Sequence, residues 1–355
     1  MMIQKMAASC RQPDQEAWQN SLRRWDSIAK PLHGLGLLED AVVKICALTG
    51  EPDCPLAPRA LVVFCADNGV VAQGVTQTGQ EVTAIVAGNM TRGATSVCKM
   101  AAHAGARVYP VDVGMVTQVP GLSFLCHSHG KGTGDITLGP AMTRAQAEDC
   151  IADGYNAACT LAGRLGYRLL AAGEMGIGNT TTSSAVASVL LGQDPEALTG
   201  RGAGLSSQGL ANKVSAIRRA IQVNRPDPAD PVDVLAKVGG FDIAAMAGFY
   251  LGASSAGVPV LLDGFISVVA ALCAVRIAPA AREAMIASHC SGEPGTRRVL
   301  EALGLAPVIS AGLCLGEGTG AVALIPLLDM AAGVYREMST FGEISVEEYR
   351  HFEDS

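Results

Sequence analysis

Aromatic side chains are scarce in this chain of 355 residues, since they make up 4% of it although 49% of its residues are hydrophobic. The apolar content therefore comes mainly from small and aliphatic side chains, and it is accompanied by 41 glycines. This composition disfavours a β-sandwich and favours an α/β protein. The length allows one large domain with an appendage.

Runs of basic residues are also absent. The formal net charge is −7 at pH 7, and Lys and Arg are adjacent to one another only as pairs at 23–24, 218–219 and 297–298. Binding to nucleic acid depends on clustered positive charge, so nucleic acid is excluded as a general partner.

Long apolar runs and paired-cysteine motifs are missing as well. The longest apolar region, residues 258–281, is interrupted by Asp263 and Arg276, so we expect no membrane span. Residues 1–6 lack the apolar core of a secretory signal.

The 11 cysteines include no CxxC pair, and several lie within apolar runs. This usage predicts free thiols and a cytoplasmic location.

The most informative segment of the chain is residues 169–191. It begins as a short apolar run, passes through glycines, and reaches Asn179-Thr180-Thr181, residue types that cap helices. A strand, a glycine-rich turn and a helix form a typical anion site, most often for phosphate, although an ordinary tight connection remains the alternative. Glu174 is unusual beside such a site. We therefore expect a cationic group, or a group that loses a proton, next to the anion.

Short apolar runs alternate with helical segments from residue 60 onward. Strands are expected at residues 60–66, 107–114, 259–264 and 285–290 and from residue 169, and Pro110 indicates an edge strand or an irregularity. Single helices are expected at 81–104 and at 143–166, the second capped by Thr143 and Gln146. The pattern predicts a doubly wound, mostly parallel sheet. We predict an N-terminal helical part of a small domain at 1–58, a large α/β catalytic domain at 59–322, and a C-terminal helix with an acidic tail at 323–355.

Polar residues end the apolar runs, and ligands of a doubly wound sheet collect at the carboxyl ends of its strands. The residues concerned are Asp67, Asp112, Glu174, Asp263, Ser291 and Glu317. Turn capping is the simpler reading for the first two.

Glu317 stands out because it lies in Gly-Glu-Gly-Thr-Gly after the apolar residues 313–315. Apolar surroundings raise the pKa of a carboxyl group and make it a better general base. His127 and His129 have a spacing that could serve a metal, but no third ligand is near, so no metal site is expected.

Several motifs occur in one order along the chain: Lys30-Pro31, CADNG at 65–69, NMTRG at 89–93, GEMGIGNTT at 173–181, KVGGFD at 237–242, PVLLDGF at 259–265 and LGEGTG at 315–320. Together they resemble the nicotinate-nucleotide–dimethylbenzimidazole phosphoribosyltransferase family, and the resemblance extends from about residue 15 to residue 340.

The resemblance implies transfer of ribose 5-phosphate from nicotinate mononucleotide to 5,6-dimethylbenzimidazole or a related lower-ligand base. The products would be an α-ribazole 5′-phosphate, for assembly of the cobamide nucleotide loop, and nicotinate. It also implies a Rossmann-like sheet of six strands, a small domain built from both chain ends, and a homodimer in which the partner's N-terminal helices help to close each site. Neither a cofactor nor a metal is implied.

The resemblance assigns roles to individual positions. Glu317 matches the general base, and Glu174 would lie near the positive charge that develops at the anomeric carbon. The nucleotide and phosphate positions are Gly176, Gly178, Asn179, Thr180, Thr181, Gly202, Lys213, Ser291 and Gly292. The acceptor-base pocket would contain Thr78, Val86, Met175 and Leu315.

The acceptor side departs from the family pattern, because Val86 replaces a frequent Gln and Thr78 aligns with a Ser. An altered acceptor (a phenol, adenine or another benzimidazole) is therefore one alternative, as is a heterodimer with a paralogue. A nucleotide N-glycosidase that uses water is another. A non-catalytic subunit that supports an active paralogue is a third, although retention of Glu174 and Glu317 speaks against it.

Overall fold

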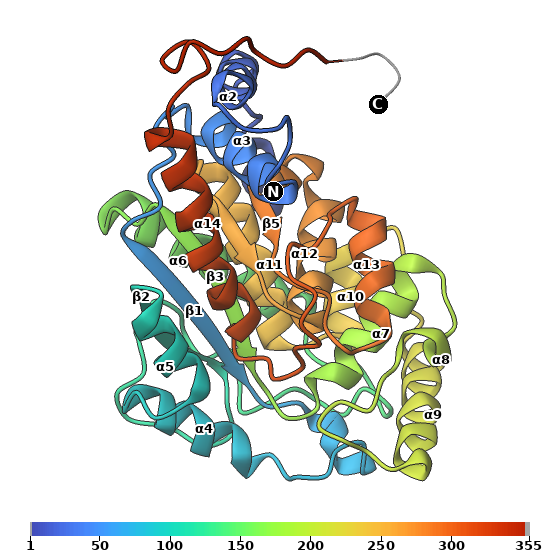
Figure 1. Cartoon of the computed structure of the whole chain (residues 1–355). Helices are drawn as coiled ribbons and strands as arrows, with labels where there is room; N and C mark the ends of the chain where they lie inside the picture. Colours follow the sequence, from blue (N-terminus) through green and yellow to red (C-terminus); the bar gives the residue numbers. More distant parts are fainter. Residues whose placement is uncertain (1, 352–355) are drawn as a thin grey trace.

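The computed structural model describes residues 2–351, and five parallel strands form one sheet within them (Figure 1). They are β1 (Arg59–Ala66), β2 (Ala106–Gly114), β3 (Leu169–Met175), β4 (Val260–Leu262) and β5 (Met285–Ala287), in the order β2-β1-β3-β4-β5. The doubly wound α/β fold is confirmed, and β2, the strand that contains Pro110, lies at an edge as predicted.

The resemblance implies a sixth strand, and beside β5 there is only a single bridge, between His289 and Ile309. The Val308 and Ile309 amides donate to the Ala287 and Ser288 carbonyls at 3.3 and 2.8 Å. Pro307 has no N–H to extend the ladder on one side, and the polar, glycine-containing residues 310–312 follow on the other. The sheet therefore has five strands within residues 2–351, and the prediction of six is wrong.

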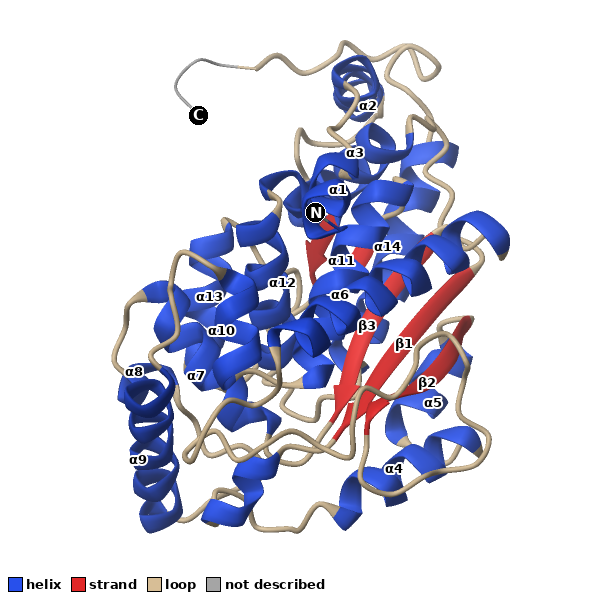
Figure 2. Ribbon diagram, turned by 180° about the vertical axis from the view of Figure 1, so that it is seen from behind, coloured by secondary structure: helices blue, strands red, loops and turns tan. Residues whose placement is uncertain are grey.

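Helices cover both faces of the sheet, and alternate residues of β1 point into two separate cores. Val62 and Phe64 belong to the core under α6 (Arg144–Cys159), α7 (Asn179–Leu191), α10 (Pro231–Val238), α11 (Phe241–Ala256) and α12 (Phe265–Ile277). Leu61 and Val63 belong to the core under α3 (Leu37–Thr49), α4 (Glu81–Thr91), α5 (Ser96–His103) and α14 (Thr319–Glu337). Figure 2 shows α6 and α11 lying across the first face.

Glycines allow α6 and α11 to pack at close range. A Cβ added to Gly154 would lie 1.8 Å from the Ala245 carbonyl oxygen, and one added to Gly248 would lie 1.9 Å from the Ile151 carbonyl oxygen. Backbones this close leave no room for larger side chains, which fits the small-residue composition of the chain.

The remaining elements are shorter connections and peripheral helices. They are α1 (Met2–Ser9), α2 (Gln15–Ser27), α8 (Pro195–Leu198), α9 (Ser207–Asn224), α13 (Gly295–Leu303), and the single-turn segments η1 (Gly69–Gln73), η2 (Thr160–Arg164) and η3 (Pro279–Ala284). The single helix expected over 81–104 is wrong, because Gly93 and its neighbours separate α4 from α5. No helix within residues 2–351 has the length and apolarity needed to cross a membrane.

The two ends of the chain meet beside the sheet, where α2 and α3 lie near α14 (Figure 1). The ring centroids of Trp25 and Tyr335 are 5.0 Å apart, and Ile28 forms an antiparallel β-bridge with Thr340. By contrast, α1 contacts α6 and α11. The division into 1–58, 59–322 and 323–355 stays a prediction. Residues 343–351 of the predicted acidic tail are exposed, and residues 1 and 352–355 lie outside the described part.

Candidate active site

A pocket opens at the carboxyl ends of β3, β4 and β5. Its walls are the turn from β3 into α7, the loop at 201–205, Lys213 of α9, and the segments that follow β4 and β5. Residues 75–78, Val86 and residues 314–317 complete the lining. This is the edge of the sheet at which a doubly wound fold is expected to bind its ligand.

The turn between β3 and α7 has the geometry expected for residues 169–191. Gly178 adopts a left-handed conformation with φ 95° just before the first residue of α7. A Cβ at Gly176 would lie 2.6 Å from the Ala66 carbonyl oxygen, so the turn passes directly over the end of β1. The sequence forms this turn because glycine allows both the backbone angle and the close approach.

A buried cation lies on one side of this turn. The Lys213 ammonium donates to the Thr180 hydroxyl at 2.8 Å and to the Gly200 carbonyl at 3.2 Å, and the side chain is fully buried. Burial lowers the pKa of Lys213 to about 8, and the neighbouring Glu293 carboxylate opposes that shift. A lysine in this environment is suited to pair with an anionic group that enters the pocket.

Acidic groups lie on the other side. The Asn179 Nδ2 atom donates to Glu174 Oε2 and, at 3.0 Å, to Asp242 Oδ2. Burial raises the pKa of Glu174 to about 8 and that of Asp242 to about 6. Glu174 is therefore mostly protonated at neutral pH in the free protein.

Glu317 occupies a strained turn at the start of α14. Its φ of 62° is rare for a residue with a side chain, and it is flanked by Gly316 and Gly318 at 86° and 89°. Asp263 holds this turn, because its carboxylate accepts from the amides of Gly318 at 3.0 Å and Gly320 at 2.7 Å.

The Glu317 carboxyl faces the pocket from this turn. Its Oε2 atom is buried and has no hydrogen-bond partner among residues 2–351. Burial raises the pKa of Glu317. A carboxyl of this kind is well placed to accept a proton from a ligand in the pocket.

Most of the predicted site residues line this one pocket. They are Glu317, Glu174, Gly176, Gly178, Asn179, Thr180, Gly202, Lys213, Ser291, Thr78, Val86, Met175 and Leu315. Thr181 is buried within α7 and Gly292 lies beside the pocket, and neither belongs to its lining. Leu315 is 54% exposed, so the approach to Glu317 is more open in this chain than its apolar sequence indicates.

Several polar residues at the site were not assigned a role from the sequence. Arg201, His289 and Glu293 line the pocket, and Asp242 lies behind it. Asp242 belongs to the KVGGFD motif and follows two glycines at a helix start, which is a signal that a search for polar residues at helix N-termini would find. Glu293 has no comparable signal beyond its closeness to Ser291 in the sequence.

The two histidines with metal-like spacing both contact Asp153. His127 Nδ1 and His129 Nε2 lie 3.0 and 3.2 Å from its Oδ2 atom. Within the described residues, no group of three or more His, Cys, Asp or Glu side chains could hold a metal ion.

Known proteins resemble this chain over most of its length. A family model described as phosphoribosyltransferase matches residues 10–346. The nicotinate-nucleotide–dimethylbenzimidazole phosphoribosyltransferase of Acetivibrio thermocellus is 45% identical over 92% of this chain and 93% of its own length. The protein of the same name from Ruminiclostridium cellulolyticum is 43% identical over 99% of this chain and 100% of its own length.

Solved structures agree with these sequence matches. The crystal structure of CobT from Thermus thermophilus has a TM-score of 0.88 and 43% identity, and the match covers 94% of this chain and 99% of that one. The chain belongs to the nicotinate-nucleotide–dimethylbenzimidazole phosphoribosyltransferase family.

Proposed function

We propose that this chain transfers ribose 5-phosphate from nicotinate mononucleotide to an aromatic base, which is the reaction that the names of its relatives describe. The observation that carries the proposal is that Glu317, whose Oε2 atom has no hydrogen-bond partner among residues 2–351, and the buried Lys213 ammonium line the same pocket. One can accept a proton while the other binds an anion, and the proposed reaction needs both.

The nucleotide lies on the Lys213 side of the pocket in this proposal. Lys213 and Thr180 bind the phosphate, with Gly202 and Ser291 close by in the lining. We retain Gly176, Gly178, Asn179, Thr181 and Gly292 as predicted nucleotide positions. Glycines in the β3–α7 turn let the backbone approach the ligand closely, which supports the assignment of the first two.

The acceptor ring nitrogen attacks the anomeric carbon on the face opposite nicotinate. The bond to the pyridinium nitrogen breaks, its electron pair neutralises the ring, and nicotinate leaves without needing a proton. The configuration inverts from β to α. The proton on the acceptor ring passes to Glu317, which must be ionised to accept it.

A turnover assay with substitution of Glu317 tests this mechanism. With nicotinate mononucleotide and 5,6-dimethylbenzimidazole, the protein should release nicotinate and form the α-riboside phosphate. Glu317→Gln should lower kcat by about 100- to 10,000-fold while the KM for the nucleotide changes little. Full turnover by that variant would remove the general-base assignment. Release of ribose 5-phosphate without an added base would instead favour an N-glycosidase.

The acceptor base lies at the opposite end of the pocket from Lys213 in this proposal. Val86 and Met175 give this end of the pocket an apolar lining, while Thr78 is exposed at its edge. We propose that loss of a polar side chain at position 86 broadens the acceptor range toward other benzimidazoles, adenine or phenols. Comparison of kcat/KM for these acceptors tests the idea, and a preference for dimethylbenzimidazole by orders of magnitude would contradict it.

Assembly and location are also proposals. A homodimer is supported by exposed apolar side chains such as Ile85 of α4, which is 57% exposed, and Phe124, which is 99% exposed. Light scattering on the purified chain tests it, and a monomer that gains activity with a paralogue would indicate a heterodimer. The 11 cysteines are all free, which supports the cytoplasm as the location.

A further inference from the structure

Asp242 is a buried carboxylate to which the proposed reaction gives no role. It is the second residue of α11, it is fully buried, and it does not line the pocket. Its Oδ1 atom accepts from the Ile243 amide at 3.0 Å, and its Oδ2 atom accepts from Asn179 at 3.0 Å. The start of a 16-residue helix favours a negative charge at this position.

The contacts of Asn179 fix the orientation of its side-chain amide. One atom of that amide contacts an oxygen of Glu174 and an oxygen of Asp242, and only the nitrogen can donate to both. Both hydrogens of the amide are therefore used. The carbonyl oxygen remains for a ligand, and Asn179 lines the pocket. Asn179 thus offers the nucleotide an acceptor, which suits a ribose hydroxyl better than a phosphate.

We propose that Asp242 is a positioning residue: it fixes the Asn179 side-chain amide, which holds Glu174 in place and presents its oxygen to a ribose hydroxyl. The inference rests on the transfer reaction proposed above. Asp242 acts through Asn179 and touches neither substrate, so its influence on the reaction passes through the two residues that line the pocket.

The same arrangement decides which of the two acids carries the charge. Glu174 faces Asn179 of α7, Asp242 of α11, Asp263 after β4 and Glu317 before α14. Burial contributes most to its raised pKa of about 8, and these three carboxyls add to it. Asp242 itself faces Asn179 and Asp67, and its pKa is about 6. At neutral pH Asp242 is therefore ionised while Glu174 keeps its proton.

A neutral Glu174 explains why an acid can lie beside an anion-binding turn. Without a charge it does not repel the phosphate held by Lys213. When Glu174 ionises as the pH rises through about 8, it should weaken nucleotide binding. Removing the Asp242 charge favours ionisation of Glu174, so the loss of binding should then occur at lower pH.

The test compares the pH dependence of the KM for nicotinate mononucleotide in four proteins: the unmodified chain, Asp242→Asn, Glu174→Gln, and the double variant. Asp242→Asn has nearly the same shape without the charge, and its single amide oxygen can accept from Asn179 if it gives up the contact with the Ile243 amide. Its KM should begin to rise about one pH unit lower than in the unmodified chain. The glutamine of Glu174→Gln cannot ionise. The pH profile of the KM should therefore be the same in Glu174→Gln and in the double variant. Lys213 titrates in the same range, and its effect should remain in all four proteins.

Each outcome decides a separate question. An unmodified chain that does not turn over the nucleotide would overturn the proposed function. Normal turnover with the same KM midpoint in Asp242→Asn would overturn the role of Asp242 alone, as would a uniform loss of activity at every pH, which indicates only a structural effect.

A second measurement does not depend on the folding of the Asp242 variant. The infrared difference spectrum between the unmodified chain and Glu174→Gln at pH 7 should contain the band of a protonated carboxyl group. Bands of a carboxylate alone would show that Glu174 is ionised at this pH and would overturn the assignment of the charge to Asp242, which the expected shift in the KM profile requires.

Discussion

Lys213 allows a prediction about a single side chain. Its side chain is fully buried, and its ammonium donates to the Thr180 hydroxyl and the Gly200 carbonyl. Lys213→Met should raise the KM for nicotinate mononucleotide by about 10- to 100-fold, because a charge-assisted hydrogen bond contributes about 1.5–3 kcal/mol. The change in kcat should be smaller.

The pH dependence of the same residue gives the control. The pKa of Lys213 is lowered to about 8, so the cation is present below this pH and is lost above it. The KM of the unmodified chain should therefore rise above about pH 8, and that of Lys213→Met should lack this component. Arg219→Met removes an exposed cation from the same helix and should leave the KM unchanged. An equal effect of the two substitutions would contradict a specific phosphate contact.

At the residue scale, the sequence was sufficient to select the pocket but not its charge state. Glu174 and Glu317 each follow a recognisable local pattern, Lys213 is indicated by the family resemblance, and all three line one cavity. The raised pKa of Glu174 is due mainly to burial, and Asp242, which is 63 positions from the shared Asn179, adds to it. Such a contact has no local signature, because only the folded chain brings α7 and α11 together.

At the element scale, β3 and the Glu317 turn are in direct backbone contact. A Cβ at Gly173 of β3 would lie 2.5 Å from the Glu317 carbonyl carbon and from the Gly318 nitrogen. Gly173→Ala should therefore displace the turn, lower kcat, and reduce the free energy of unfolding by about 1–3 kcal/mol. Turnover and urea unfolding measure the two effects.

Gly163→Ala is the matched control for this substitution. A Cβ at Gly163 would meet no heavy atom within 4 Å, so both kcat and stability should stay near those of the unmodified chain. If Gly173→Ala behaved in the same way, β3 would not support the position of Glu317.

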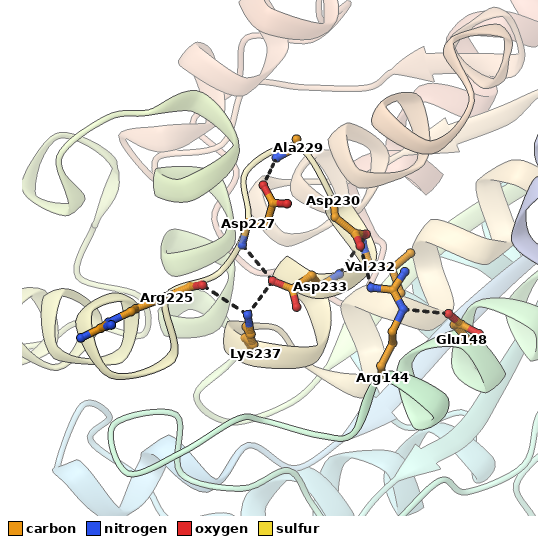
Figure 3. Close-up of polar contacts among 9 residues, drawn as sticks. All are labelled: Arg144, Glu148, Arg225, Asp227, Ala229, Asp230, Val232, Asp233 and Lys237. Atoms are coloured by element: carbon orange, nitrogen blue, oxygen red, sulfur yellow. Dashed lines mark hydrogen bonds and ion pairs between the residues drawn. The ribbon is translucent and has the colours of Figure 1, made fainter.

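A second prediction at this scale concerns the start of α10, shown in Figure 3. Asp230 caps this helix, since its Oδ1 accepts from the Val232 amide at 3.0 Å, and its Oδ2 accepts from Arg144 at 2.6 Å. Asp230→Ala should reduce the free energy of unfolding by about 1 kcal/mol. Arg144→Ala removes only a half-exposed ion pair and should reduce the free energy of unfolding by less than Asp230→Ala does. Neither residue lines the pocket, so kcat should not change. Equal losses of stability would contradict the cap as the main contribution.

The elements themselves were predictable where their signals are local. The capping box of Thr143 and Gln146 is confirmed at the start of α6, and Pro110 indicated the edge strand. The break between α4 and α5 and the missing sixth strand were not foreseen. Gly93 has a left-handed conformation with φ 67° just after α4, and Pro307, which has no N–H, precedes the single bridge beside β5.

At the scale of the whole molecule, composition and architecture agree. The α6–α11 contact leaves no space for a Cβ at Gly154 or Gly248, so a chain rich in glycine and poor in aromatics can cover its sheet at short distances. The composition alone could not show that this close packing occurs between α6 and α11, on the face that also carries Asp242.

The stability of the whole molecule should depend on pH through Glu174. Its pKa is about 8 in the folded protein, against an ordinary value of 4.5, so the folded state binds more protons than the unfolded state between these limits. The stability associated with this proton is fully present below about pH 4.5 and is lost as the pH rises toward 8. Lys213 affects stability in the opposite direction, because its pKa is lowered, and its effect occurs above about pH 8.

Glu174→Gln replaces the acid by a neutral amide, so urea unfolding between about pH 5 and pH 8 should show the variant gaining stability relative to the unmodified chain as the pH rises. Asp242, with a pKa of about 6, acts in both proteins over the lower part of this range and should largely cancel in the comparison. Parallel stability curves for the two proteins would mean that Glu174 is ionised in the folded chain.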